Sequence, residues 1–195
     1  MLFHYHYWTP YLEETEKFYT ELGFTVHQRI GRLDGSFQSF NPPLAWKDFR
    51  DNLPMFRIIE MKMGKINVTV GYGKKVIFDH IGFFVSKEEH GIVCEKARNL
   101  GWKVEEDERR TFISTPYGFR IELQIHPDVL AAGDAAIEKM ILSIRKEGLE
   151  KDLHRLFNRD VRVFSVLDEE INVQQVVING IVPVKDPNGV SICSI

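Results

Sequence analysis

Alternation between polar and apolar positions marks the beginning of the chain as a β-strand. Within residues 2–9 every second residue shares a face, so His4 and His6 lie on the same side. The spacing of apolar residues then changes to that of an amphipathic helix over residues 13–22, with acidic residues in its first turn. The chain is therefore predicted to open with a strand and a helix, and both histidines face the same way.

The same pattern begins again at residue 76. The strand-like run of residues 76–85 carries His80, which lies 76 positions after His4, and a charged helical segment follows it. Both helical segments end with a leucine, a glycine suited to a helix C-terminus and an aromatic residue, at Leu22-Gly-Phe and Leu100-Gly-Trp. Such self-similarity indicates a duplicated unit made of a strand, a helix and further strands.

The rest of the first unit is predicted to be β-structure. Its elements are a hairpin of residues 24–30 and 36–40 around the Asp34-Gly35 turn, a proline-bounded loop at 42–54, and a strand at 55–63. In the second unit the pattern predicts a helix over residues 88–100 and strands at 103–107, 111–114 and 119–125.

The alignment of the two units leaves open which residue answers Glu122. The run Phe56-Arg-Ile-Ile-Glu60 is similar to Phe119-Arg-Ile-Glu122, which makes Glu60 the counterpart. A further alternating run at residues 65–70 has no evident match in the second unit, and if it is the equivalent strand, the counterpart is Asn67. We favour Glu60 because it needs the smaller insertion.

From residue 131 the repeat signature is absent, so this part is not counted as a third copy. A helix capped by Asp134 is predicted there, with an apolar stripe that resumes beyond Gly148. The stripe consists of Ile137, Met140, Ile141 and Ile144, and then Leu149, Leu153 and Leu156. Strands are predicted to follow at 161–167, 171–178 and 181–184, with a last one near the C-terminus.

The chain thus divides into a first βαβββ unit at 1–74, a second at 75–130 and a helix-and-hairpin extension at 131–195. The fold class is α+β. The apolar stripe of the extension must be buried. Either the extension packs outside the second unit, with hairpins that reach a partner subunit, or it roofs the site. We favour the first arrangement, because the tight Asn179-Gly180 turn makes a stiff hairpin rather than a mobile lid.

Composition narrows the classes of partner. The 25 basic and 28 acidic residues are mixed along the chain and leave a net charge of -3, so neither nucleic acid nor a membrane is expected as a partner. No apolar run approaches the roughly 18 residues that span a bilayer. Two cysteines and an N-terminus without a cationic leader favour a cytoplasmic protein.

Four side chains at matching places in the two units are candidates for a functional site. Imidazole or carboxylate groups on a buried strand face are costly without a partner. Convergence of His4, Glu60, His80 and Glu122 on one divalent ion would remove that cost, and nitrogen and oxygen ligands suit Zn, Ni, Co, Mn or Fe. The alternative is that each histidine is a satisfied core residue. His6 is expected to be a supporting or substrate-facing group, or a solvated histidine at the rim.

The paired βαβββ pattern, the histidine on each first strand and the run Thr115-Pro-Tyr-Gly-Phe-Arg-Ile-Glu-Leu123 resemble the vicinal oxygen chelate superfamily. This superfamily includes glyoxalase I, bleomycin resistance proteins and extradiol dioxygenases. The resemblance covers roughly residues 1–127. It implies a cup-shaped mixed sheet with a metal on its floor, and by position it implies His4, Glu60, His80 and Glu122 as ligands.

Three functions are compatible with this resemblance. With four ligands, a glyoxalase-like enzyme acting on a small substrate with two neighbouring oxygens is favoured, with Glu60 or Glu122 as the catalytic base. If Glu60 is not a ligand, the remaining three match the triad of iron dioxygenases. The third possibility is a non-catalytic ligand-binding protein of the bleomycin-resistance type. A small-molecule ligand and a possible homodimer are expected in each case.

Overall fold

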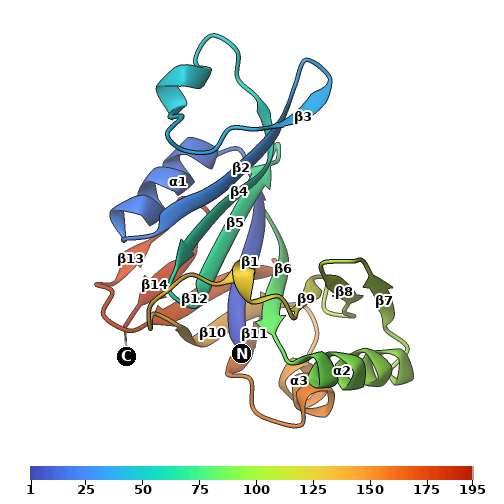
Figure 1. The fold of residues 1–195 in the computed structure, drawn as a ribbon. Coiled ribbons are helices and arrows are strands. Elements are labelled where there is room, and N and C mark those ends of the chain that lie inside the picture. The colour runs from blue at the N-terminus through green and yellow to red at the C-terminus, as the bar shows by residue number, and fades with distance from the viewer. Residues whose placement is uncertain (195) are drawn as a thin grey trace.

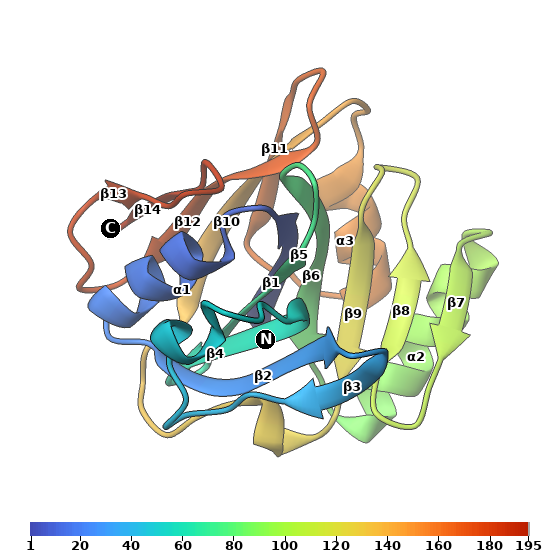
Figure 2. The same ribbon diagram turned by 90° about the horizontal axis from the view of Figure 1, so that it is seen from above.

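The strands of the two repeated units join into one nine-stranded sheet that curves into a cup (Figures 1 and 2). The computed structural model describes residues 1–194. The strand order is β3-β2-β4-β5-β1-β6-β9-β8-β7, so β1 and β6, the first strands of the two units, lie side by side at the centre. The helices α1 and α2 lie outside the cup. The predicted α+β fold of two units sharing a cup-shaped mixed sheet is confirmed.

The elements of the two units fall close to the predicted ranges. The first unit contains β1 (Leu2–Thr9), α1 (Leu12–Glu21), β2 (Thr25–Leu33), β3 (Ser36–Ser39), a 3₁₀ turn at Trp46–Phe49, β4 (Met55–Met63) and β5 (Ile66–Tyr72). The second contains β6 (Ile77–Phe84), α2 (Lys87–Asn99), β7 (Lys103–Glu106), β8 (Thr111–Ser114), β9 (Arg120–Gln124) and a 3₁₀ turn at Pro127–Val129.

Strand pairing corrects the alignment of the two units. In each unit the first strand pairs in parallel with the last one, β1 with β5 and β6 with β9. The counterpart of β9 is therefore β5 and not β4, so Glu60 does not hold the position that we favoured for it. Among the described residues the hairpin strand β3 has no counterpart in the second unit. Because of this additional strand, β4 was matched with β9 when the strands were counted along the sequence.

The register also excludes Asn67 as the equivalent of Glu122. β1 and β6 are antiparallel, with His4 opposite Gly82 and His6 opposite His80, as expected for two units related by an approximate twofold axis. On the outer sides, Gly82 pairs with Glu122 and His6 pairs with Thr69. Because His6 and Gly82 are equivalent, the residue equivalent to Glu122 is Thr69.

The prediction for the start of the extension is wrong. Residues Ile137–Ile144 form a strand, β10, and not a helix. Met140, Leu142, Ser143 and Ile144 are all fully buried there. A central strand covered on both faces reads as a nearly continuous apolar run, which periodicity does not distinguish from a buried helix. The helix predicted beyond Gly148 is confirmed as α3 (Leu149–Phe157).

The extension builds a second sheet outside the cup. It has five strands in the order β11-β10-β12-β14-β13, with β11 at Val163–Leu167, β12 at Asn172–Ile178, β13 at Val184–Lys185 and β14 at Ser191–Cys193. Tyr7 on the convex side of β1 donates a hydrogen bond to the side chain of Asn172 and accepts one from the Val173 backbone N–H at 3.1 Å. The extension therefore covers the outside of both units and does not roof the cup. In residues 1–194 no helix is long and apolar enough to cross a membrane.

A buried carboxylate fastens the end of the extension to the first unit. Asp186 is 5% exposed and accepts hydrogen bonds from the Tyr19 hydroxyl at 2.9 Å and from the backbone N–H groups of Asn188 and Val190 at 2.8 Å each. Tyr19 belongs to α1, so this one side chain joins helix α1 to the turn before β14. Burial raises the pKa of the Asp186 carboxyl.

Asp186→Ala is expected to lower the free energy of unfolding by about 2–4 kcal/mol, since it leaves three buried donors without an acceptor. Urea denaturation followed by circular dichroism measures this change. Asp134→Ala is the control, because the side chain of Asp134 is fully exposed. An equally small effect of both substitutions would contradict the fastening role of Asp186.

Candidate metal centre

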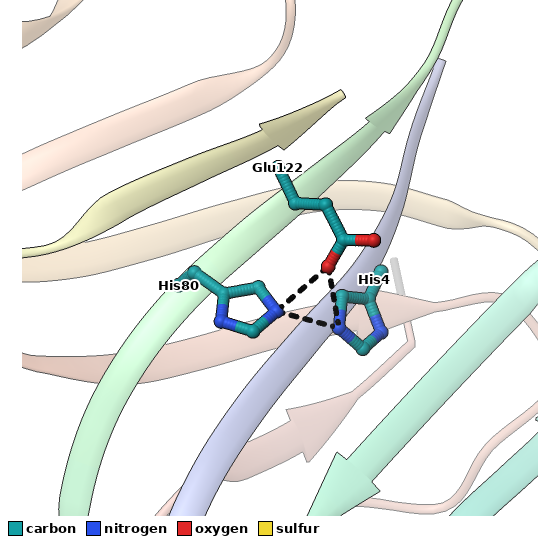
Figure 3. A group of neighbouring side chains, drawn as sticks. All are labelled: His4, His80 and Glu122. Atoms are coloured by element: carbon teal, nitrogen blue, oxygen red, sulfur yellow. Dashed lines mark hydrogen bonds and ion pairs between the residues drawn. The ribbon is translucent and has the colours of Figure 1, made fainter. Parts of the chain in front are cut away.

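Three of the four predicted ligands meet at the centre of the cup (Figure 3). The Nε2 atoms of His4 and His80 are 3.0 Å apart, and Glu122 Oε2 lies 2.9 Å from His80 Nε2 and 3.8 Å from His4 Nε2. The three side chains come from the adjacent strands β1, β6 and β9, and each is about 5% exposed. One chain alone therefore brings both histidines and the carboxylate within reach of a single ion.

Hydrogen bonds on the far side of each imidazole orient both rings. His4 Nδ1 lies 2.9 Å from the backbone carbonyl oxygen of Asn67, and His80 Nδ1 lies 2.6 Å from Asp79 Oδ2. Because both of these partners accept hydrogen bonds, each Nδ1 carries a proton, which leaves the Nε2 lone pair of each ring available to a metal ion. Two such lone pairs and a carboxylate oxygen, all close together, repel one another unless a cation lies among them. The donor set therefore fits a bound metal ion.

The electrostatics favour the protonation states that bind metal. Burial lowers the pKa of His4 to about 4, although the charge of Glu122 acts in the opposite direction. Burial would raise the pKa of Glu122, but its contacts with His80, with His4 and with the Gln124 amide outweigh burial and lower that pKa to about 2. At neutral pH His4 is thus neutral and Glu122 is ionised, as ligands must be.

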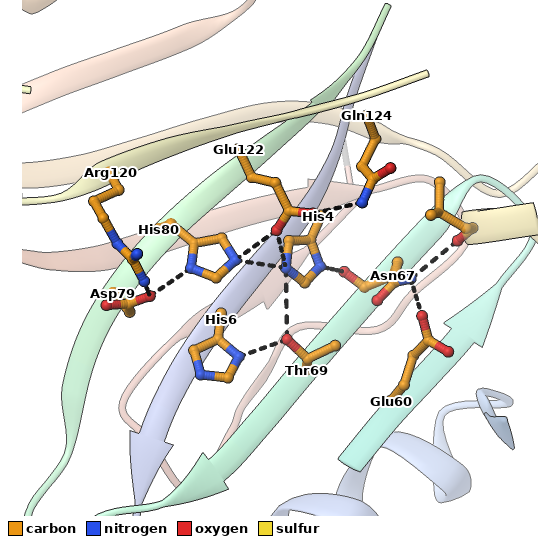
Figure 4. A network of polar contacts seen from close by, with 11 residues as sticks. His4, His6, Glu60, Asn67, Thr69, Asp79, His80, Arg120, Glu122 and Gln124 are labelled. Atoms are coloured by element: carbon orange, nitrogen blue, oxygen red, sulfur yellow. Dashed lines mark hydrogen bonds and ion pairs between the residues drawn. The ribbon is translucent and has the colours of Figure 1, made fainter. Parts of the chain in front are cut away.

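Glu60 does not join this group. Its carboxylate accepts a hydrogen bond from Asn67 Nδ2 at 2.7 Å and lies 3.3 Å from the Lys62 ammonium (Figure 4). The position equivalent to Glu122 holds Thr69, whose hydroxyl is 3.5 Å from His4 Nε2. The structure therefore gathers two histidines and one carboxylate, with a hydroxyl at the fourth place.

His6 is buried next to the triad and is not a solvated rim residue. Its ring stacks on His80, with centroids 5.0 Å apart, and its Nδ1 lies 2.6 Å from the Thr69 hydroxyl. Burial, and after it the charges of His80 and His4, hold the pKa of His6 well below its usual range. His6 therefore supports the ring of His80 as a neutral side chain.

A pocket of about 600 Å³ opens beside the triad. Lys62, Asp128 and Gln124 line it, and nothing in the repeat pattern had singled them out. Gln124 could have been predicted from the sequence, because it shares a face of its strand with the ligand Glu122. Asp79 could also have been predicted as a partner of His80, because it directly precedes that histidine. The remaining lining residues are Phe3, His4, Gln28, Ile58, Glu60, Asn67, Thr69, His80, Asp107, Glu108, Arg109, Arg110, Glu122 and Val129.

The cup of two βαβββ units with this site on its concave side is the vicinal oxygen chelate fold. Solved structures with the same fold include 2,2',3-trihydroxybiphenyl 1,2-dioxygenase from Sphingomonas wittichii strain RW1 (TM-score 0.60, 10% identity, covering 92% of this chain and 72% of that one). Homoprotocatechuate 2,3-dioxygenase from Brevibacterium fuscum in complex with 3,4-dihydroxyphenylacetate is also similar (TM-score 0.62, 12% identity, covering 98% and 79%).

A mutant of 4-hydroxymandelate synthase from Streptomyces coelicolor is similar as well (TM-score 0.58, 9% identity, covering 95% and 71%). No family model matches the sequence, and no curated protein matches it. At these identities the similarity concerns the fold alone.

Asp79→Asn is expected to weaken metal binding by about 10–100-fold, as loss of an outer partner of a metal-bound histidine typically does. Asp79 accepts hydrogen bonds from His80 and from Arg120, which hold the pKa of its carboxyl below its usual range although burial would raise it. Titration calorimetry with cobalt(II) measures the affinity, and Asp134→Asn is the exposed control. Unchanged affinity would exclude the positioning role.

The two glutamates separate a three-ligand site from a four-ligand site. Glu122→Gln is expected to weaken cobalt(II) binding by at least about 100-fold, more than the loss of an outer partner. Glu60→Gln is expected to change it less than about threefold, because the Glu60 carboxylate is held by Asn67 and Lys62. Equal losses in both variants would show that Glu60 moves in to bind the ion.

Proposed function

We propose that the protein is an iron(II)-dependent dioxygenase that opens the ring of a catechol-type substrate. The observation that carries this proposal is the triad of His4, His80 and Glu122 without a second carboxylate. Two histidines and one carboxylate on one face of the ion, with the other positions open, are typical of non-haem iron(II) oxygenases. The fold similarity to dioxygenases supports the same reading.

The residues of the chain would divide the work as follows. His4, His80 and Glu122 would hold the ion from one side. The Asn67 carbonyl oxygen orients the ring of His4, and Asp79 orients the ring of His80. When bound, iron supplies the Lewis acidity and the one-electron chemistry that join dioxygen to the ring. The neighbouring pocket is of the size that small organic ligands occupy, and it would keep the ring in one orientation beside the open side of the triad.

A glyoxalase-like isomerisation is less well supported. That reading needed Glu60 as a fourth ligand or as the base that moves a proton. In the structure the Glu60 carboxylate is engaged by Asn67 Nδ2 and by Lys62, and Thr69 takes the place of a second acidic ligand. Thr69 is a neutral hydroxyl, which neither supplies a second negative charge nor accepts a proton at neutral pH.

Oxygen uptake tests the proposal. Protein loaded anaerobically with iron(II) is mixed with air-saturated buffer and a panel of substituted catechols. Consumption of one O₂ per substrate is expected, with a product whose mass equals that of the substrate plus two oxygen atoms. His80→Ala should lose at least about 100-fold of this activity, since one of the three ligands is missing. His154→Ala on α3, outside the cup, is the control.

Other results of the same experiment would decide for the alternatives. Isomerisation of 2-oxoaldehyde hemithioacetals without oxygen uptake would establish the glyoxalase-like function. Tight binding of an aromatic compound without metal and without turnover would establish a ligand-binding protein. Oxygen uptake that His80→Ala leaves unchanged would contradict the assignment of the site.

A further inference from the structure

Strand β11 is a free edge of the second sheet. It pairs with β10 on one side, and in residues 1–194 no strand pairs with its other side. Large apolar side chains are nevertheless exposed along it: Phe164 is 40% exposed, Val166 48% and Leu167 60%. Native proteins usually protect an exposed edge with charged residues, bulges or a covering element, because such an edge pairs with other strands. This edge is therefore a candidate interaction surface.

The backbone of β11 has hydrogen-bonding groups to offer a further strand. The Arg162 carbonyl oxygen and the Asp168 N–H, at the two ends of β11, both bond to β10. Alternate residues of a strand direct their N–H and C=O groups to opposite sides. Val163, Ser165 and Leu167 therefore direct theirs away from β10, toward the position that a further strand would take.

A second copy of β11 fits this edge in the antiparallel orientation. When the two strands are centred on Ser165, each Ser165 lies opposite the other, and Val163 lies opposite Leu167 of the second copy. These are the residues with outward groups, and opposed residues that exchange both of their hydrogen bonds are the repeating unit of an antiparallel ladder. The arrangement has a twofold axis at the Ser165 pair, and twofold symmetry is the commonest symmetry of homo-oligomers.

The apolar side chains agree with the same register. Phe164 and Val166 are two residues apart, so they share a face of β11. In the antiparallel pair Phe164 lies opposite Val166 of the second copy, once on each side of the axis. An aromatic residue opposite a β-branched one is a favourable cross-strand pair. The pairing would therefore bury apolar side chains that the single chain leaves in water.

The charges at the ends of the strand are complementary as well. Arg162 precedes β11 and Asp168 follows it, so the same register places Arg162 opposite Asp168 of the second copy. Arg162 Nη1 lies 3.2 Å from Glu138 Oε2, and Asp168 Oδ1 accepts a hydrogen bond from the Glu170 N–H at 3.1 Å. Arg162 Nη2 and Asp168 Oδ2 are left for a pair across the axis. Opposite charges stabilise directly opposed positions of two strands.

One carboxylate competes with the second copy for the edge. Glu150 on α3 accepts hydrogen bonds from the Ser165 N–H at 2.6 Å and from the Ser165 hydroxyl at 2.9 Å. Next to it, between α3 and β11, is a hollow of about 260 Å³ that Leu153 and Val163 help to line. Glu150 is exposed, so its side chain can turn into water when a strand takes its place. Glu150 thus lowers the affinity of the edge for a second copy and does not cover the edge.

We propose that the protein forms a reversible homodimer in which two β11 strands pair antiparallel about a twofold axis at Ser165. The two five-stranded sheets then form one continuous sheet across the dimer. The occupant of the edge is a second copy because hydrogen-bonding groups, apolar side chains and charges of β11 are all complementary to β11 itself. No residue of the candidate metal centre takes part, so this inference is independent of the proposed function.

Sedimentation velocity of the 195-residue chain over about 2–200 µM protein tests the proposal, since small interfaces are weak. A dimer whose fraction rises with concentration is expected. Val166→Asp should raise the Kd of the dimer at least about tenfold, because it places a charge against Phe164 on both sides of the axis. Val182→Asp is the control, because Val182 is 76% exposed and lies outside β11. A monomer at every concentration, or an equal effect of both substitutions, overturns the proposal.

Two further variants test the backbone pairing in opposite directions. Ser165→Pro removes an N–H that β10 does not use, so the fold is kept while the Ser165 pair is lost, and the Kd should rise at least about tenfold. Glu150→Ala frees the same N–H for the second copy, and the Kd should fall at least about threefold. Circular dichroism shows that each variant is folded. Unchanged dimerisation of folded Ser165→Pro, or weaker dimerisation of Glu150→Ala, contradicts the pairing through β11.

A charge exchange tests the register. Arg162→Asp and Asp168→Arg each set like charges opposite one another, and each is expected to raise the Kd about tenfold. The double variant restores opposite charges at both places, and its Kd should return to within about threefold of that of the unchanged chain. Single variants that dimerise like the unchanged chain, or a double variant as weak as the single ones, overturn the register centred on Ser165.

Discussion

Mutual repulsion among three buried electron-pair donors is the constraint around which this structure is organised. His4 Nε2, His80 Nε2 and Glu122 Oε2 face one another at the centre of the nine-stranded sheet, where each side chain is shielded from water. A cation among its members removes this repulsion, because leaving ionised or polar groups unpaired in this environment costs several kcal/mol. Hydrogen bonds to His4 Nδ1, His80 Nδ1 and Glu122 Oε1 hold these three atoms in place from the far side of each side chain.

The way in which the sheet is built explains why the three donors meet. β1 and β6 are neighbours, and each pairs on its other side with the last strand of its own unit. The equivalent side chains of His4 and His80 therefore meet at the seam, and the equivalent residues Thr69 and Glu122 lie on the two strands that flank it. The second sheet presses on the convex side of the same strands through Tyr7, so the floor of the cup is packed on its outer face while its inner face stays free for a ligand.

The two central strands β1 and β6 could be predicted from the sequence, but the strand of the first unit that pairs in parallel with β1 could not. The histidine in each first strand and the shared helix endings identify the repeat, and they lead to His4, His80 and Glu122. The similarity between Phe56-Arg-Ile-Ile-Glu60 and the end of the second unit was misleading, because that strand is equivalent to β8 in the sheet order. The strand that pairs in parallel with β1 is decided by contacts between residues far apart in the sequence. No local sequence feature shows that β3 is an additional strand, so β4 and β5 could not be told apart as the equivalent of β9.

The extension shows the same limit in another form. Ile137, Met140, Ile141 and Ile144 satisfy the spacing of a helix, yet they form a strand that neighbours cover on both sides. What decides the conformation is the pairing of this segment with β11 and β12, which follow it by many residues. Leu149 to Phe157 could be predicted as a helix because its other face is exposed, so that its period of about 3.6 is visible in the sequence.

The replacement of a second carboxylate by Thr69 has a consequence for the charge of a loaded site. A divalent ion held by two neutral histidines and by Glu122 alone keeps one net positive charge. Asp79 does not alter this balance, because Arg120 neutralises it on the outer side of His80. A second glutamate in the place of Thr69 would have cancelled the remaining charge. A site with this charge would favour a ligand that binds through one anionic oxygen, which agrees with the catechol-type substrate that we propose.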